Sequence, residues 1–218
     1  MPFISTLAKE DAAASSSTKD GYLNPSRIKS GNKVRFTLLA DEPFMFYELW
    51  GQEALDPQKR KPFRFIADPT KEDIDVKLGS DFVRSLARDG KGFEPCRIAQ
   101  AVPVYNHELE KVQVFSWIQK TITTQFDQIS QLEDYADSMT DVDFFLSRTG
   151  EGTDTTYNLA AVPRKKGTTG TIEEEWSKVQ EEGFDLSRLI DGGDPFKESE
   201  LSPLIGGLTT LFLFCYIV

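Results

Sequence analysis

Short runs in which apolar and polar residues alternate recur along this chain. In the clearest run, residues 33–38, Lys33, Arg35 and Thr37 alternate with valine, phenylalanine and leucine. A period of two residues is typical of a strand with one buried face, because successive side chains point to opposite faces of a sheet. The pattern predicts that strands form most of the structure and that this strand has a basic outer face.

Strand patterns return in six further stretches, at residues 44–50, 62–66, 97–105, 111–118, 142–148 and 155–162. In the stretch 44–50, Glu48 lies on the same face as Phe44, Phe46 and Trp50, so we expect that face to be the more exposed to solvent. A polar turn at residues 106–110 joins the third stretch to the fourth, and two glycines within residues 149–154 permit a tight turn between the last two. We therefore expect two β-hairpins in the second half of the chain.

One segment has the period of a helix instead. Apolar residues recur at steps of three and four between Ile118 and Ala136, which fits an amphipathic helix of about five turns at ~3.6 residues per turn. The polar stretch 67–94 contains glycines that break regular structure, so we expect a mobile insertion there with a short helix at residues 80–88. The order along the chain is thus strands, one principal helix, and strands again.

This order predicts an all-β fold with one principal helix, namely an OB-fold-like five-stranded Greek-key barrel that is closed and carries extra strands and insertions. With 218 residues, of which 39% are apolar, the chain is long enough to bury a core. The cysteines, Cys96 and Cys215, and the single histidine, His107, are too few for a zinc finger and argue against a disulfide framework. We expect no metal and no cofactor.

Acidic residues concentrate near the end of the chain. Residues 1–168 hold 22 basic and 25 acidic residues, whereas residues 169–218 hold 3 and 10. The expected organisation is a flexible arm (1–20), an OB-fold domain (21–165), an acidic C-terminal tail (166–200) and an apolar C-terminal segment (201–218). A body that is nearly neutral can still bind polyanions through a local basic patch.

Three stretches resemble single-stranded DNA-binding proteins of tailed phages. Residues 140–157 contain the string Arg-x-Gly-x-Gly-x-Asp-Thr-x-Tyr and resemble the last hairpin of that family. Residues 21–36, 48–51 and 61–65 resemble its opening, and residues 104–106 and 112–115 its central hairpin. The resemblance implies an OB-fold protein that coats and protects single-stranded DNA in phage replication, recombination and repair in the host cytoplasm. It also implies recruitment of partner enzymes through an acidic tail.

Binding of a single strand requires cations along the backbone and aromatic faces on which bases stack, at about 1–3 kcal/mol per base. Phe115 and Trp117 share an expected outward face with Lys111 and Gln113, which favours stacking over core packing. The candidate phosphate-binding residues are Lys33, Arg35, Arg60, Arg64, Arg97, Lys111, Lys120 and Arg148. The candidate stacking residues are Trp50, Tyr105, Phe115, Trp117 and Tyr157. We expect the face of Phe115 and Trp117 to join Lys33, Arg35 and Arg64 in one groove.

Two other functions stand as alternatives. A phage structural or protein-interaction module would use the barrel without binding nucleic acid. A Mg²⁺-dependent nuclease would need scattered carboxylates to converge, and we favour a solvated helix end and loop for these residues, which are Glu133, Asp134, Asp137, Asp141 and Asp143. The chain has no Gly-x-Ser-x-Gly elbow to serve His107, and Cys96 fits a half-buried structural thiol, so we expect no enzyme activity.

The two ends of the chain carry further expectations. The acidic residues of 173–196, with interspersed hydrophobes, are expected to bind replication and recombination proteins or to compete with nucleic acid; the alternatives are a solubilising tail or a short helix at 173–181. The apolar residues 204–218 are fewer than the ~20 that span a membrane. We therefore favour packing onto the body, homo-oligomerisation or an altered reading-frame end over a membrane anchor. Residues 1–20 lack a signal-peptide pattern, which indicates a cytosolic protein.

Overall fold

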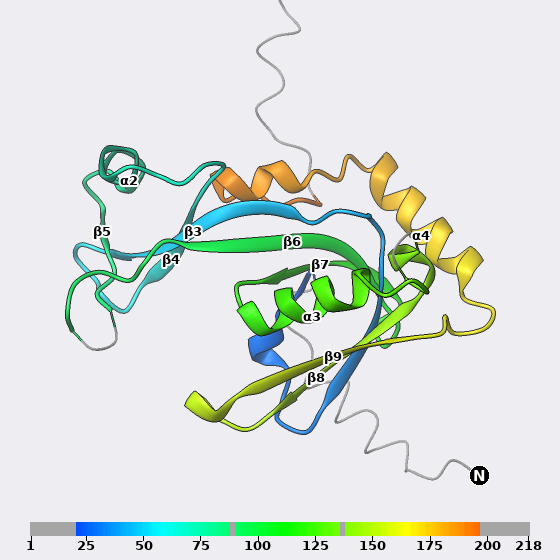
Figure 1. Ribbon diagram of the computed structural model, residues 1–218. Coiled ribbons are helices and arrows are strands. Elements are labelled where there is room, and N and C mark those ends of the chain that lie inside the picture. The colour runs from blue at the N-terminus through cyan, green and yellow to red at the C-terminus, as the bar shows by residue number, and fades with distance from the viewer. Residues whose placement is uncertain (1–20, 88–89, 136–137, 197–218) are drawn as a thin grey trace, which may run out of the picture.

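The computed structural model describes residues 21–87, 90–135 and 138–196 (Figure 1). In this part of the chain nine strands form one mixed sheet, and the structure is mostly β with a few helices. The strands are β1 (Tyr22–Leu23), β2 (Lys33–Leu38), β3 (Phe44–Glu53), β4 (Arg60–Phe65), β5 (Phe82–Arg84), β6 (Arg97–Asn106), β7 (Lys111–Trp117), β8 (Asp143–Thr149) and β9 (Thr156–Val162). The helices are α2 (Lys71–Leu78), α3 (Lys120–Ser130) and α4 (Thr169–Glu181), and the 3-10 turns are η1 (Pro25–Arg27), η2 (Met139–Asp141), η3 (Gly152–Asp154) and η4 (Leu186–Asp191).

The long strand β6 joins two halves of the sheet. Its later residues pair antiparallel with β2, where Leu38 lies opposite Val104, and its first residues pair antiparallel with β3, where Phe44 lies opposite Ala101. One half therefore runs β7-β6-β2-β8-β9, while β3 carries β4 and β5 into the other half. The expected hairpins are present as the pairs β6–β7 and β8–β9.

Helix α3 covers one face of the first half. Ile122 of α3 is fully buried, and Phe126 packs against Phe115, Trp117 and Phe144. These rings continue into a cluster that includes Phe36 of β2. The amphipathic period in the sequence is thus used to bury one side of α3 against three strands.

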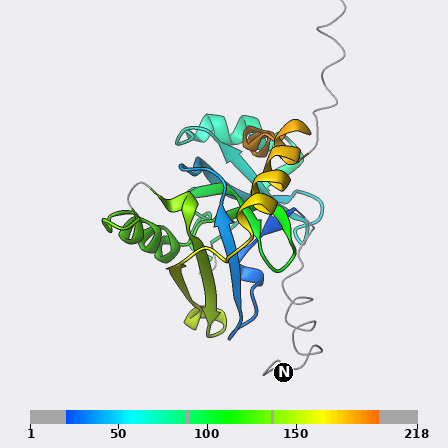
Figure 2. The same cartoon turned by 90° about the vertical axis from the view of Figure 1, so that its right-hand side faces the viewer.

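The C-terminal segment α4–η4 covers the opposite face of β6 and β7. Leu189 of η4 is buried against Phe46, Ala99 and Val114, and Figure 1 shows α4 and η4 on the other side of β6 and β7 from α3. Figure 2 shows the same arrangement turned by 90°. The acidic residues 169–191 therefore form a helix and a turn that are folded onto the sheet. Residues 1–20 and 201–218, named above as arm and apolar end, lie outside the described residues.

A third cluster forms where α2 packs on β3 and β4. Ile74 and Leu78 of α2 are buried against Leu49 and Phe63. Glycine at position 51 leaves room for this packing, because a Cβ atom there would lie 2.6 Å from a ring carbon of Phe63. The close contact fixes α2 against the extension that β4 and β5 add to the sheet.

Two predictions about individual elements are wrong. Residues 80–88 do not form a helix: a capping box between Thr70 and Asp73 starts α2 earlier, and Phe82–Arg84 pairs with β3 as a strand. Helix α3 ends at Ser130, and Leu132 is half exposed although it continues the apolar period. The insertion 67–94 thus contributes a folded helix and strand, as far as it is described.

Within the described residues the sheet does not close into a barrel by strand pairing, contrary to expectation. In the described residues β7 pairs with β6 and β1, and β9 pairs with β8. Gln125 of α3 instead bonds the free edge of β9, since its side-chain amide donates to the Tyr157 carbonyl at 3.0 Å and accepts from the Leu159 amide at 2.6 Å. No helix in the described part of the chain is long and apolar enough to cross a membrane.

Candidate nucleic-acid interface

One face of β3 is only half covered. The alternation of the strand places Phe44, Phe46, Glu48 and Trp50 on the same face. Leu189 of η4 packs on the Phe46 end of this face. Glu48 and Trp50 lie beyond that cover, and Trp50 retains 37% of its accessible surface. The sheet therefore presents an indole ring next to a carboxylate on an open surface.

Two arginines flank Glu48 on the neighbouring strands. Arg64 of β4 and Arg97 of β6 both lie directly opposite Glu48 in the strand register. Nε of Arg64 donates to Oε2 of Glu48 at 2.9 Å, and its Nη1 donates to the carbonyl of Leu189 at 3.1 Å. Arg97 is exposed. One carboxylate thus lies between two cations, which leaves a net positive strip across three strands.

A third arginine lies beside the indole of Trp50. The guanidinium carbon of Arg60 is 5.7 Å from the centre of the Trp50 ring. Nε of Arg60 donates to Oγ of Ser85 at 3.2 Å, and Nη2 pairs with Oε1 of Glu94 at 3.1 Å. These contacts hold a cation over the face of the Trp50 ring, the geometry of a cation–π pair.

These residues line two adjoining hollows of about 410 and 460 Å³ that share Glu48, Trp50 and Ile118. We call the combined surface the basic groove. Its charged lining residues are the cations Arg27, Arg60, Arg64 and Arg97 and the carboxylates Glu48 and Glu94. The groove is therefore positive, although the whole chain has a formal net charge of -10.

Four predicted site residues with accessible side chains meet in the basic groove, namely Trp50, Arg60, Arg64 and Arg97. The buried Trp117 also contributes to the wall of the groove, and Lys120 lines a neighbouring hollow. The other four predicted aromatics, Tyr105, Phe115, Trp117 and Tyr157, are buried. The expected outward face of β7 is wrong because α3 covers that face while η4 covers the other. Trp117 is only 4% exposed, and its Nε1 donates to Oγ1 of Thr123 at 3.0 Å.

The remaining predicted cations lie outside the basic groove. Lys33 lies over the ring of Phe145 at 4.4 Å, and Arg148 donates to the carbonyls of Ser26 and Ile28 at 2.8 and 2.9 Å. Lys111, at the start of β7, does not line the groove. The predicted union of Phe115 and Trp117 with Lys33, Arg35 and Arg64 in one groove is therefore not formed.

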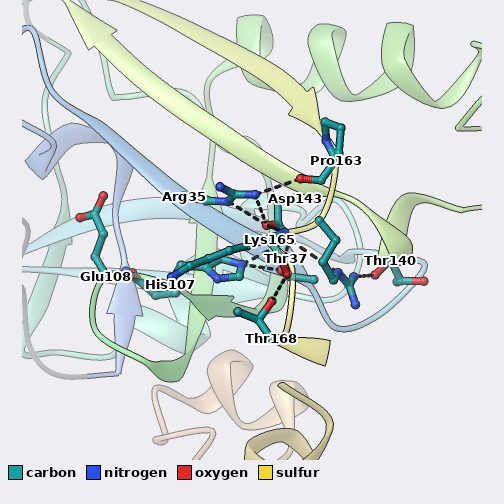
Figure 3. Close-up of polar contacts among 11 residues, drawn as sticks. Arg35, Thr37, His107, Glu108, Thr140, Asp143, Pro163, Lys165 and Thr168 are labelled. Carbon is teal, nitrogen blue, oxygen red and sulfur yellow. Dashed lines mark hydrogen bonds and ion pairs between the residues drawn. The ribbon is translucent and has the colours of Figure 1, made fainter. Parts of the chain in front are cut away.

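Arg35 belongs instead to a buried cluster around Asp143, which is the first residue of β8 (Figure 3). The Asp143 carboxylate accepts hydrogen bonds from Nε of Arg35 at 2.7 Å, Oγ1 of Thr37 at 2.6 Å and the amide of Lys165 at 3.0 Å. Nε2 of His107 lies 3.2 Å from the same carboxylate. Burial alone would raise the pKa of Asp143, but hydrogen bonds from His107, Thr37 and Lys165 outweigh it and hold the pKa well below its usual value.

This cluster ties together four parts of the chain, and its centre is closed to solvent. It joins β2, the β6–β7 turn, β8 and the segment that leads into α4, where Nη2 of Arg35 also donates to the Pro163 carbonyl at 2.9 Å. Thr37, His107 and Asp143 are all buried. Because Thr37 gives its hydroxyl proton to Asp143 and no substrate can reach it, the arrangement is suited to holding the fold rather than to nucleophilic attack.

The carboxylates considered for a nuclease do not form a metal site in the described residues. No group of three or more potential ligands is found there, Asp143 is committed to the buried cluster, and Asp137 lies outside the described residues. Cys96 is half-buried, and burial raises the pKa of its thiol, as expected for a structural cysteine.

No family model matches the sequence, and no curated protein or solved structure matches it either.

Proposed function

We propose that this chain is a sequence-nonspecific single-stranded DNA-binding protein that coats and protects the strand in phage replication, recombination and repair. The observation that carries the proposal is the exposed indole of Trp50, which lies with Arg60, Arg64 and Arg97 on one face of the sheet. An aromatic platform beside backbone-tracking cations is the combination that binds single strands irrespective of sequence.

The strand order supports an OB-type barrel. The order β7-β6-β2-β8-β9, with α3 between β7 and β8 in the chain, is that of a partly open five-stranded Greek key. Such folds bind nucleic acid on their second and third strands and on the loop before the second strand. If β2 and β3 together form the first strand, residues 54–96 are that loop, and Arg60, Glu94 and Pro95 of this segment line the basic groove.

The existing ion pairs in the groove allow phosphate to replace a carboxylate. The pair of Arg60 with Glu94 is partly exposed, and such pairs contribute about 0–1 kcal/mol. A phosphate that displaces Glu94 or shares Arg60 therefore costs little. Indole and guanidinium planes stack on any base, which accounts for binding without sequence preference.

The acidic helix α4 is the proposed contact for replication and recombination enzymes. Glu173, Glu174 and Glu181 are exposed on it, and partners with basic pockets are the class that such a surface attracts. The alternative function, a phage structural or protein-interaction module, is favoured by the burial of Phe115 and Trp117 and by the net charge of -10.

Titration of a fluorescent oligo-dT by anisotropy at several salt concentrations, with duplex DNA as comparison, tests the proposal. We expect preference for the single strand and a slope of log K against log salt of about -0.7 per neutralised phosphate. Trp50→Ala should weaken binding about tenfold with the slope unchanged, since a stacked base contributes about 1–3 kcal/mol. Arg97→Ala should reduce the slope by about 0.7.

Lys33→Ala is the matched control, because Lys33 is an exposed cation outside the basic groove. It should leave both affinity and slope unchanged. Equal losses in the Lys33 and Arg97 variants would contradict the groove assignment, and absence of binding at low salt would support the interaction module instead.

A further inference from the structure

A third hollow of about 940 Å³ adjoins the basic groove. It shares Pro95, Arg97 and Ile118 with the groove but lies toward α3, where Lys120 and Thr123 contribute to its wall. We call it the α3 hollow. Because the two surfaces have residues in common, they form one continuous depression around the start of β6.

The start of β6 permits passage from one face of the sheet to the other. The partner strand β7 ends with Trp117 opposite Gln100, whereas β6 begins three residues earlier, at Arg97. On that side the first residues of β6 have no β7 partner. Arg97 and Ile98 alternate in direction, and Arg97 lines both the basic groove and the α3 hollow, whereas Ile98 lines only the α3 hollow.

The lining of the α3 hollow fits bases together with phosphates. Met45 and Ile98 provide an apolar surface, and they are 50% and 52% exposed. Arg97 and Lys120 supply positive charge, and its lining residues include no carboxylate. Apolar side chains flanked by cations match the alternation of base and phosphate along a single strand.

We propose that a bound single strand continues from the basic groove around the start of β6 into the α3 hollow, so that the binding path has two segments. This inference rests on the proposed function. A strand long enough to fill both segments contacts Trp50 in the first and Met45, Ile98 and Lys120 in the second, whereas a short oligonucleotide occupies the basic groove alone.

The test measures the affinity of the full chain for oligo-dT of increasing length, from about 4 to 16 nucleotides, the range of site sizes of OB folds. The variants are Lys120→Glu and Ile98→Asp, both at exposed positions. Lys33→Glu is the control for Lys120→Glu, because it makes the same change of charge at an exposed position outside both hollows. Circular dichroism and thermal melting check that each variant is folded.

We expect the wild-type affinity to rise with length and then to level off. The two variants at the α3 hollow should bind the shortest oligonucleotide like the wild type but lose about tenfold or more on the longest, while Lys33→Glu should keep the wild-type length dependence. An equal loss of affinity at every oligonucleotide length, or no loss at any length, would refute the second segment of the binding path without refuting binding in the basic groove. Failure of the wild type to bind any length would overturn the proposed function itself.

Discussion

Replacement of Asp143 by asparagine should destabilise the protein strongly. The side chain is fully buried and accepts hydrogen bonds from Arg35, Thr37 and the Lys165 amide. Asparagine has almost the same shape, but it removes the charge opposite the Arg35 guanidinium and presents an N–H₂ group to donors. Loss of one partner of a buried ion pair costs about 3–5 kcal/mol, which corresponds to a melting temperature lower by roughly 10 °C in a domain of this size.

The assay is urea denaturation followed by tryptophan fluorescence and circular dichroism at several pH values. Because the folded-state pKa of Asp143 lies below its unfolded value, the stabilisation is fully present above the unfolded pKa of about 3.9 and is lost as the pH falls through the folded pKa. The difference between wild type and Asp143→Asn should therefore shrink by about 1.4 kcal/mol per pH unit as the pH falls below about pH 4.

Asp68→Asn provides the control, since Asp68 is exposed and such surface changes fall within about 0.5 kcal/mol. A cost below about 1 kcal/mol for Asp143→Asn at pH 7, or a difference that stays constant down to pH 3, would refute the argument that the charge of Asp143 stabilises the cluster.

Two further substitutions test the packing. Gly51→Ala should lower the free energy of unfolding by about 1–3 kcal/mol in thermal or urea denaturation, because its Cβ would lie 2.6 Å from the Phe63 ring and 2.8 Å from Leu78. A melting temperature equal to that of the wild type would contradict this prediction and show that α2 can shift to accommodate the methyl group. Phe115→Ala should cost about 3–5 kcal/mol, while the protein that remains folded should bind oligo-dT like the wild type; a selective loss of affinity at unchanged stability would restore Phe115 as a stacking residue.

The alternation of apolar and polar residues was sufficient to predict most strands, and it failed where a strand is covered on both sides. β2, β8 and β9 appear close to their predicted positions. For β7 the same pattern predicted an outward face for Phe115, because a sequence period does not reveal that α3 and η4 cover opposite faces. The covering elements are distant in the chain, so only tertiary structure identifies them.

The sequence analysis missed the start of α2 and the role of Asp143, and only the first of these has a complete local signal. Thr70 and Asp73 have the spacing of a capping box, which would have placed α2 before Gly79. Asp143 stands at the head of a strand of apolar residues, yet its partners Arg35 and Thr37 are more than 100 residues away. In the candidate site, Arg60, Arg64, Arg97 and Trp50 were predicted from residue type, and only the strand register showed which cations share a face.

The amide of Gln125 has a consequence for how this chain behaves at high concentration. A strand at the border of a sheet presents unpaired N–H and C=O groups, on which a second molecule can add its own strand and begin aggregation. Gln125 bonds both a carbonyl and an amide of β9, as a neighbouring strand would. One side chain on a helix thus blocks the middle of that border against strand addition by a second molecule.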